Sequence, residues 1–391
     1  MPHPGNTRVV SRITHAALTA LILVAVVSLQ IRGGAARPVS PAVIGYVYGT
    51  GRVLDTATIA AAKLTHINYA FANVKDGLVV EGAPGDADNL QRLGALRAAN
   101  SSLKLLVSIG GWSWSKGFSE AAMTEASRWA FVTSAIALVH RYDLDGLDID
   151  WEYPGLEGDN NPHRPEDGDH FVELAKALRQ ALDAEGRSRR RPLLLTCAAG
   201  AFPDALAHSG LDRAWRSLDY VNLMTYDFRV QEVDRVTGHH ANLYLNPADT
   251  QKLSGDGAVT AFSGAGIPLD RLVLGMPFYG RAWVEVPEAA DGLFQTGVAP
   301  TARLDLSPPG VDALLASGEG WVRKWDSAAQ APFLWNPAKH IFASIEDEDS
   351  AALKGKYVRQ HGLAGVMFWE YGSDPSGRLL DAVNRGLGRA P

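Results

Sequence analysis

Three carboxylates occupy alternate positions in an apolar stretch of the chain. Asp148, Asp150 and Glu152 lie within "LDGLDIDWEYP", separated by Ile and Trp. Alternate side chains of a β-strand point to the same face, so the three carboxyl groups are expected to lie close together. Like charge at short range and partial burial raise at least one pKa and favour a shared proton. The stretch therefore predicts acid–base chemistry, with Glu152 as the proton donor at its C-terminal end.

An acidic strand can also be a solvated edge strand or a metal site. A solvated edge strand would carry acids, but the inner face of a central strand is not solvated. A hard cation could be bound by Asp and Glu, but His239 and His240 lie in a predicted loop rather than at a ligand spacing. We therefore expect no metal ion and no cofactor.

Short apolar segments alternate along the chain with segments of helical periodicity. This pattern is typical of parallel strands joined by crossover helices. Eight such units predict an α/β fold of the closed (β/α)₈ type, a TIM barrel, rather than an open sheet. The predicted strands are residues 42–48, 66–72, 104–110, 146–152, 193–199, 220–226, 272–278 and 365–370.

The interval between the seventh and eighth predicted strands is much longer than the others. About 85 residues separate Phe278 from Gly365, far more than a usual connection. We expect residues 282–344 to form a small α+β insertion between these strands. Residues 40–281 and 345–391 would then form the barrel.

The first residues of the sequence differ from the rest. Arg8 and Arg12 precede an apolar run over residues 16–31, which is typical of an export signal. The run is shorter than the ~20 residues of a membrane span. We interpret residues 1–36 as a signal peptide, with a membrane anchor through residues 16–31 as the alternative. The protein is expected to be secreted or periplasmic.

Composition excludes some classes of partner. A net charge of −6 argues against nucleic-acid binding, which requires a basic face. The single cysteine, Cys197, cannot form an intrachain disulfide and lies in an apolar run, so we expect a buried side chain. The basic cluster at residues 187–191 is interpreted as a solvated loop. We expect a monomer.

Polar and aromatic residues also gather at the ends of other predicted strands. In residues 220–226 the alternation aligns Asn222, Met224 and Tyr226, and Asp227 begins the next loop. Several aromatic side chains around a carboxylate cluster suit a cleft that stacks on sugar faces. The further strand-end residues are Trp112, Tyr279, Arg281 and Trp369.

Together these motifs resemble glycoside hydrolase family 18, the chitinases and their relatives. "DGLDIDWE" has the D-x-x-D-x-D-x-E form of that family, beginning at Asp145. "SIGGW", "LMTYD", "GMPFYGRAW" and "GLAGVMFWE" are similar to further family motifs, in the same order. The insertion resembles the small α+β domain that many chitinases carry.

The resemblance implies substrate-assisted hydrolysis of β-1,4-linked N-acetylglucosamine with retained anomeric configuration. Glu152 would protonate the glycosidic oxygen while the 2-acetamido oxygen of the sugar attacks the anomeric carbon. Asp150 would orient the acetamido N–H, and Asp148 would share a proton behind it. Tyr226 would hydrogen-bond the acetamido oxygen. The implied substrate is chitin or a chito-oligosaccharide.

The resemblance also implies roles for residues around the acids. Tyr46 and Ser108 would support the acidic pair, and the other residues would contact sugar: Trp112, Met224, Asp227, Tyr279, Arg281 and Trp369. Two alternatives remain open, an endo-β-N-acetylglucosaminidase acting on other glycans and a chitin-binding lectin. Family lectins usually lack the acid that Glu152 supplies here, which disfavours the lectin.

Overall fold

The computed structural model describes residues 40–49 and 51–390, so the predicted signal segment lies outside the described residues. Eight parallel strands form a sheet that closes on itself, because β1 pairs with both β2 and β13. The predicted (β/α)₈ barrel is confirmed. Its strands are β1 (Ala42–Tyr48), β2 (His66–Lys75), β4 (Lys104–Gly110), β5 (Gly146–Asp150), β6 (Leu194–Gly200), β7 (Tyr220–Met224), β8 (Leu272–Pro277) and β13 (Gly365–Trp369).

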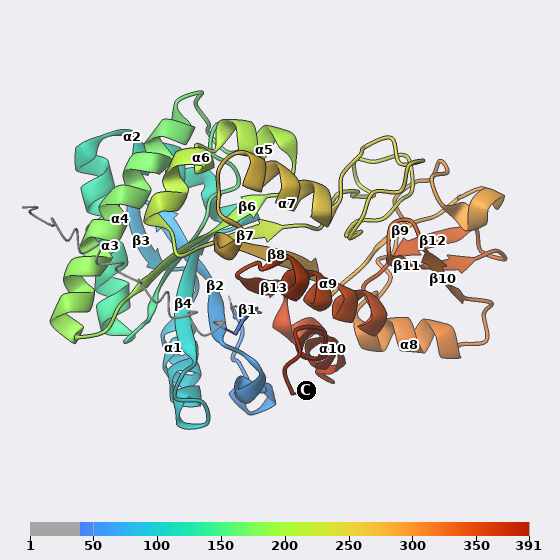
Figure 1. Ribbon diagram of the computed structural model, residues 1–391, viewed down its shortest axis with the longest axis horizontal. Coiled ribbons are helices and arrows are strands. Elements are labelled where there is room, and N and C mark those ends of the chain that lie inside the picture. Colours follow the sequence, from blue (N-terminus) through green and yellow to red (C-terminus); the bar gives the residue numbers. More distant parts are fainter. Residues whose placement is uncertain (1–39, 50, 391) are drawn as a thin grey trace, which may run out of the picture. The chain divides into compact units, whose positions relative to one another are not determined.

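Helices surround the barrel, and β3 (Leu78–Glu81) extends β2 as an antiparallel strand (Figure 1). The α-helices are α1 (Asp86–Ala95), α2 (Phe118–Met123), α3 (Glu125–Arg141), α4 (Asp167–Arg189), α5 (Pro203–His208), α6 (Leu211–Ala214), α7 (Gly255–Gly264), α9 (Glu348–His361) and α10 (Arg378–Gly386). Short 3₁₀ helices include η3 (Leu96–Ala98), η4 (Trp112–Gly117) and η5 (Trp215–Ser217). Over the described ranges, no helix is both long and apolar enough to cross a membrane.

Strand β5 shows how the alternation of residue types builds the barrel. Its outward side chains, Leu147 and Ile149, are buried in the layer between sheet and helices. Trp151, just beyond the strand, stacks on Phe118 of α2 with ring centroids 5.2 Å apart, and its edge contacts Phe171 of α4. Because the apolar side chains face the helices, the acids at the alternate positions point into the barrel.

Two predicted strands end two residues earlier than the sequence indicates. β5 stops at Asp150 and β7 stops at Met224, so Glu152 and Tyr226 lie two residues beyond their strands. Both residues therefore belong to loops at the C-terminal ends of the parallel strands. In a (β/α)₈ barrel this end carries the site, because the βα loops converge there.

A second sheet lies to one side of the barrel (Figure 1), in the long interval between β8 and β13. It is antiparallel, in the order β10-β11-β12-β9, and α8 (Pro308–Ala316) belongs to the same interval. Trp283, Phe333 and Phe342 form part of its own apolar cluster. The strands are β9 (Arg281–Trp283), β10 (Val322–Asp326), β11 (Ala331–Asn336) and β12 (Ile341–Ser344). The division at residues 282 and 344 stays a prediction.

Candidate active site

A cleft of about 1100 Å³ opens at the C-terminal ends of the barrel strands. Residues of the second sheet and its connections, among them Arg281 and Arg303, contribute to its lining. Ten of the twelve site residues expected from the sequence line this cleft, and the other two, Asp148 and Ser108, are fully buried beside it. The ten are Tyr46, Trp112, Asp150, Glu152, Met224, Tyr226, Asp227, Tyr279, Arg281 and Trp369.

Asp148 lies inside the barrel and is held by four hydrogen bonds. Its Oδ2 accepts from the hydroxyls of Tyr46 and Ser108, both at 2.8 Å. Its Oδ1 accepts from Thr196 Oγ1 at 2.5 Å and from Asn222 Nδ2 at 3.2 Å. Burial raises the pKa of Asp148, and the four donors act against that rise. The carboxyl group is thereby fixed in position beneath the cleft.

Asp150 and Glu152 are buried carboxyl groups at the bottom of the cleft. Burial, followed by the charges of Glu152 and Asp148, raises the pKa of Asp150 well above its ordinary value. Burial also raises the pKa of Glu152 to about 7, against a lowering hydrogen bond with Tyr153 and with a further rise from the charge of Asp227. Glu152 can therefore hold a proton near neutral pH, as a general acid must.

One oxygen of this acidic row is free to bind something else. Asp150 Oδ1 is buried and has no hydrogen-bond partner among the described residues. A buried carboxylate oxygen without a donor is costly, so a ligand N–H or O–H placed there would be favoured. Burial raises the pKa of nearby Tyr226 well above its ordinary value, which keeps its hydroxyl protonated and able to donate.

Trp369, the last residue of β13, presents a flat aromatic surface to the cleft. Its ring stacks on Phe71 with centroids 5.3 Å apart and an interplanar angle of 22°. The rings of Tyr46 and Tyr48 meet it edge-on at 6.0 and 5.9 Å. Three aromatic neighbours thus fix the orientation of the indole, and such a surface suits the apolar face of a sugar ring.

Asp227 joins the barrel to the second sheet. Arg281, on β9, donates two hydrogen bonds to its carboxylate at 2.8 and 2.6 Å, and Tyr279 donates a third at 2.8 Å. His240 lies 3.5 Å away through Nδ1. Although burial raises it, the hydrogen bonds of His240 and Arg281 hold the pKa of Asp227 below its ordinary value. Asp227 is therefore an ionised group in the cleft lining, and its charge acts on Glu152.

This arrangement of acids, tyrosine and tryptophan at the barrel mouth agrees with a comparison of the whole chain. A model of the glycosyl hydrolases family 18 matches residues 42–374. The chain belongs to this family.

Two family 18 relatives align with most of this chain. Chitinase A1 of Niallia circulans is 32% identical over 86% of this chain, which spans only 56% of that relative's length. Chitinase B of Serratia marcescens is 31% identical over 83% of this chain and 76% of its own length.

Solved structures of the family superpose well on this fold. A family 18 N-acetylglucosaminidase from Paenibacillus barengoltzii is 39% identical, with a TM-score of 0.80 over 88% of this chain and 99% of its own. A class V chitinase from Nicotiana tobaccum, solved in complex with NAG4, is 26% identical, with a TM-score of 0.80 over 90% of this chain and 100% of its own.

The structure adds residues to the family 18 site that the sequence analysis did not assign. Thr196 and Asn222 complete the hydrogen bonds to Asp148, and Phe71 supports Trp369. Thr196 could have been found, since it is a polar residue within the otherwise apolar strand β6. Phe71 carried no such signal, because an aromatic residue in a buried strand is ordinary core.

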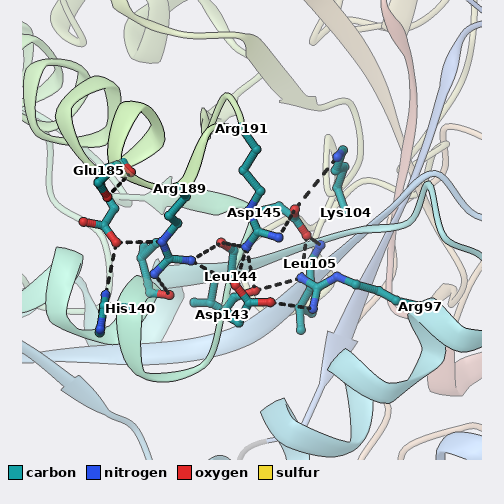
Figure 2. Close-up of polar contacts among 12 residues, drawn as sticks. Arg97, Lys104, Leu105, His140, Asp143, Leu144, Asp145, Glu185, Arg189 and Arg191 are labelled. Carbon is teal, nitrogen blue, oxygen red and sulfur yellow. Dashed lines mark hydrogen bonds and ion pairs between the residues drawn. The ribbon is translucent and has the colours of Figure 1, made fainter.

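The first acid of the family motif does not join the others. Asp145 precedes β5 and therefore lies at the end of the barrel opposite the cleft, and Figure 2 shows its contacts there. It accepts hydrogen bonds from Arg97 at 2.5 Å and from the Leu105 amide at 2.9 Å. A strand rises about 3.3 Å per residue, so Asp145 is roughly 10 Å from Asp148 along the chain. Asp145 therefore joins neighbouring barrel segments and does not serve the cleft.

Within residues 40–49 and 51–390, no group of three or more His, Cys, Asp or Glu side chains is arranged to hold a metal ion. His239 is engaged with Asp326, and His240 with Asp227. The expectation of a metal-free reaction stays a prediction.

Proposed function

We propose that this family 18 protein is a chitinase that hydrolyses β-1,4-linked N-acetylglucosamine chains with retention of configuration. The observation that carries the proposal is the pair formed by Glu152 and Asp150. Glu152 holds a proton near neutral pH, and Asp150 offers an unpartnered buried oxygen beside it. The names of the relatives and the aromatic floor of the cleft support the same substrate class.

In the first step, Glu152 gives its proton to the glycosidic oxygen and the leaving sugar departs. The acetamido oxygen of the bound sugar attacks the anomeric carbon, which forms a cyclic oxazolinium cation. Asp150 passes its proton to Asp148, so that its Oδ1 accepts the acetamido N–H and its negative charge offsets the developing positive charge. The hydroxyl of Tyr226 donates a hydrogen bond to the acetamido oxygen and orients it.

In the second step, Glu152 is a carboxylate and acts as a general base. It takes a proton from a water molecule, whose oxygen attacks the anomeric carbon from the side that the leaving group vacated. The cyclic cation opens, the acetamido group is restored and the product keeps its β-configuration. Glu152 is protonated again and ready for another cycle.

Hydrolysis of a defined N-acetylglucosamine hexamer tests the proposal. We expect the full chain to release short oligomers whose new reducing ends are β-anomers early in the reaction, with and without chelator. Early α-anomers would contradict retention. Binding without cleavage would instead identify a lectin.

A second candidate function is suggested by the 39% identical N-acetylglucosaminidase. The same acetamido chemistry would serve an enzyme that removes single sugars from chain ends or one that acts on other glycans. The hexamer experiment separates the candidates, because single N-acetylglucosamine units would then be the main early product. Cleavage of a glycan core with an intact hexamer would favour the endo-β-N-acetylglucosaminidase.

We also propose that the enzyme is exported through residues 1–36 and works as a monomer without a nucleic-acid partner. The support is the run over residues 16–31 behind Arg8 and Arg12, and the net charge of −6. Sequencing the N-terminus of the exported protein would separate a cleaved signal from a retained anchor.

The raised pKa of Glu152 predicts the pH dependence of the reaction. Only the protonated form can act as the acid, so kcat/KM should fall as pH rises through about 7. The charge of Asp227 raises the pKa of Glu152, so Asp227→Asn should move this fall to lower pH. Rates on an oligosaccharide from pH 4 to pH 10 give the pH at which kcat/KM has fallen to half of its maximum. This midpoint does not depend on the maximal value of kcat/KM. An unmoved midpoint would show that Asp227 does not act on Glu152.

A further inference from the structure

The end of the barrel opposite the cleft is rich in cations. Each helix that returns to a strand ends near the N-terminal end of that strand, so the helix C-termini gather at this end. Cations are favoured in the last helical turns because they offset the helix dipole. The residues concerned include Arg97, Arg187, Arg189, Arg216, Arg359 and Arg385. Acids in the first turns, such as Asp167 and Asp212, lie at the cleft end.

Among the arginines at this end, Arg187 and Arg190 are neighbours that have no anionic partner in the described chain. Arg187 lies in the last turn of α4, Arg190 follows the helix, and both are exposed. With Arg191 they line a surface hollow of about 360 Å³ just before β6. Asp183 is the carboxylate in its lining, and it is paired with Arg179 at 2.6 Å. The cluster is thus the end of a helix rather than the solvated loop expected from the sequence.

Other carboxylates near residues 187–191 are already paired with cations, as Figure 2 shows. Asp143 and Asp145 are shared among Arg97, Arg189 and Arg191, and Lys104 lies 3.8 Å from Asp145. Glu185 accepts from Arg189 at 2.6 Å and from His140 at 3.1 Å. These contacts leave the charges of Arg187 and Arg190 uncompensated. Guanidinium groups bind carboxylates and phosphates in a bidentate manner, so a ligand that carries phosphate groups can bind these two arginines.

The described chain begins on this same end of the barrel. β1 starts at Ala42, and Arg389, just after α10, donates a hydrogen bond to the Pro41 carbonyl at 3.2 Å. The preceding sequence, with its apolar run over residues 16–31 and the following Arg32, is therefore joined to the basic end. A chain in which an apolar run is joined to a basic surface is suited to binding a membrane.

We propose that the basic face around Arg187, Arg190 and Arg191 docks on an anionic lipid bilayer through lipid phosphates. The cleft, at the opposite end of the barrel, would then face away from the membrane toward a polymeric substrate. A bilayer fits better than a nucleic acid, because the net charge is −6 and the apolar run over residues 16–31 precedes the strand that begins at this end. The proposal concerns binding and does not depend on the reaction of the cleft.

The test uses the full chain and two kinds of vesicle, phosphatidylcholine alone and phosphatidylcholine with about 30% phosphatidylglycerol. The ratio of the two partition coefficients cancels any contribution of the apolar run. The variant is Arg187→Gln with Arg190→Asn. Arg190 has a φ of +57°, which Asn tolerates, so the backbone is not strained.

A matched control removes two cations from the cleft end. Lys116, in η4, and Lys252, which precedes α7 and has a φ of +58°, are both exposed. Lys116→Gln with Lys252→Asn changes the net charge by the same amount. Thermal unfolding of both double variants checks that the fold is retained.

We expect the wild-type chain to prefer the anionic vesicles. Arg187→Gln/Arg190→Asn should lower that preference about 25-fold, because each cation contributes about fivefold to the partition coefficient. The control pair should leave it within about twofold, and roughly 0.5 M NaCl should abolish it by screening. A wild-type ratio near one would overturn the proposal. An equal loss in both double variants would also overturn it, since net charge rather than this face would then govern binding. Binding of soluble polyphosphate without a vesicle preference would identify a soluble polyanion as the ligand instead.

Discussion

Replacing Glu152 with Gln should lower kcat on the N-acetylglucosamine hexamer by about 10²- to 10⁴-fold while leaving binding of the hexamer largely intact. The amide has nearly the same shape, but it has no acidic proton to give to the glycosidic oxygen. It also cannot act as the base that activates water in the second step. Initial rates and calorimetric binding of the hexamer measure the two effects separately.

Glu157 provides a matched control for this substitution. It lies five residues further along the same loop, is exposed and does not line the cleft. Glu157→Gln therefore makes the same chemical change without touching the acidic row. If kcat of Glu152→Gln equalled kcat of Glu157→Gln, a group other than Glu152 would be the acid.

Replacing Asp150 with Asn should lower kcat by about 10²- to 10³-fold, because charge stabilisation at the cation is lost. The neutral amide leaves the shape of the site unchanged but cannot offset the positive charge of the cyclic intermediate. If the NH₂ group of the Asn side chain took the place of the unpartnered Oδ1, it would face the acetamido N–H. Both groups are donors, so no hydrogen bond would form. Both effects act on the chemical step, so kcat should fall more than KM rises.

The control for Asp150→Asn is Asp76→Asn. Asp76 is exposed, has a φ of +52° that Asn tolerates, and does not line the cleft. The outcome that would contradict the role of Asp150 is a variant with wild-type kcat and a raised KM. Asp150 would then only bind the ground state of the substrate.

The local pattern of residue types was sufficient to predict the barrel. A buried parallel strand needs a short apolar run, and β1 and β4 begin and end where such runs do. Alternation along β5 placed Asp148 and Asp150 on one face, since successive side chains of a strand point to opposite sides. The ends of parallel strands meet at one edge of the sheet, so residues far apart in sequence, such as Glu152 and Trp369, were expected in one cleft.

The partners of these residues could be identified only in the folded chain. Asp148 takes hydrogen bonds from Tyr46, Ser108, Thr196 and Asn222, which lie on four other strands. Which hydroxyl faces which carboxylate depends on the register and closure of the barrel, and neither is a local property. The pKa of Glu152 depends in turn on burial and on Asp227, which comes from another loop.

The tertiary structure also separated residues that the sequence groups together. Asp145 and Glu152 belong to one motif but lie toward opposite ends of the barrel, because an extended strand carries them apart. The arginines of residues 187–191 divide in the same way: Arg189 and Arg191 are paired with acids, and Arg187 and Arg190 are not. The sequence by itself determined the residue types, the strands and the face on which the acids lie. Only packing decided which charges are neutralised by neighbours and which remain available to a ligand, because that depends on distances between segments far apart in the chain.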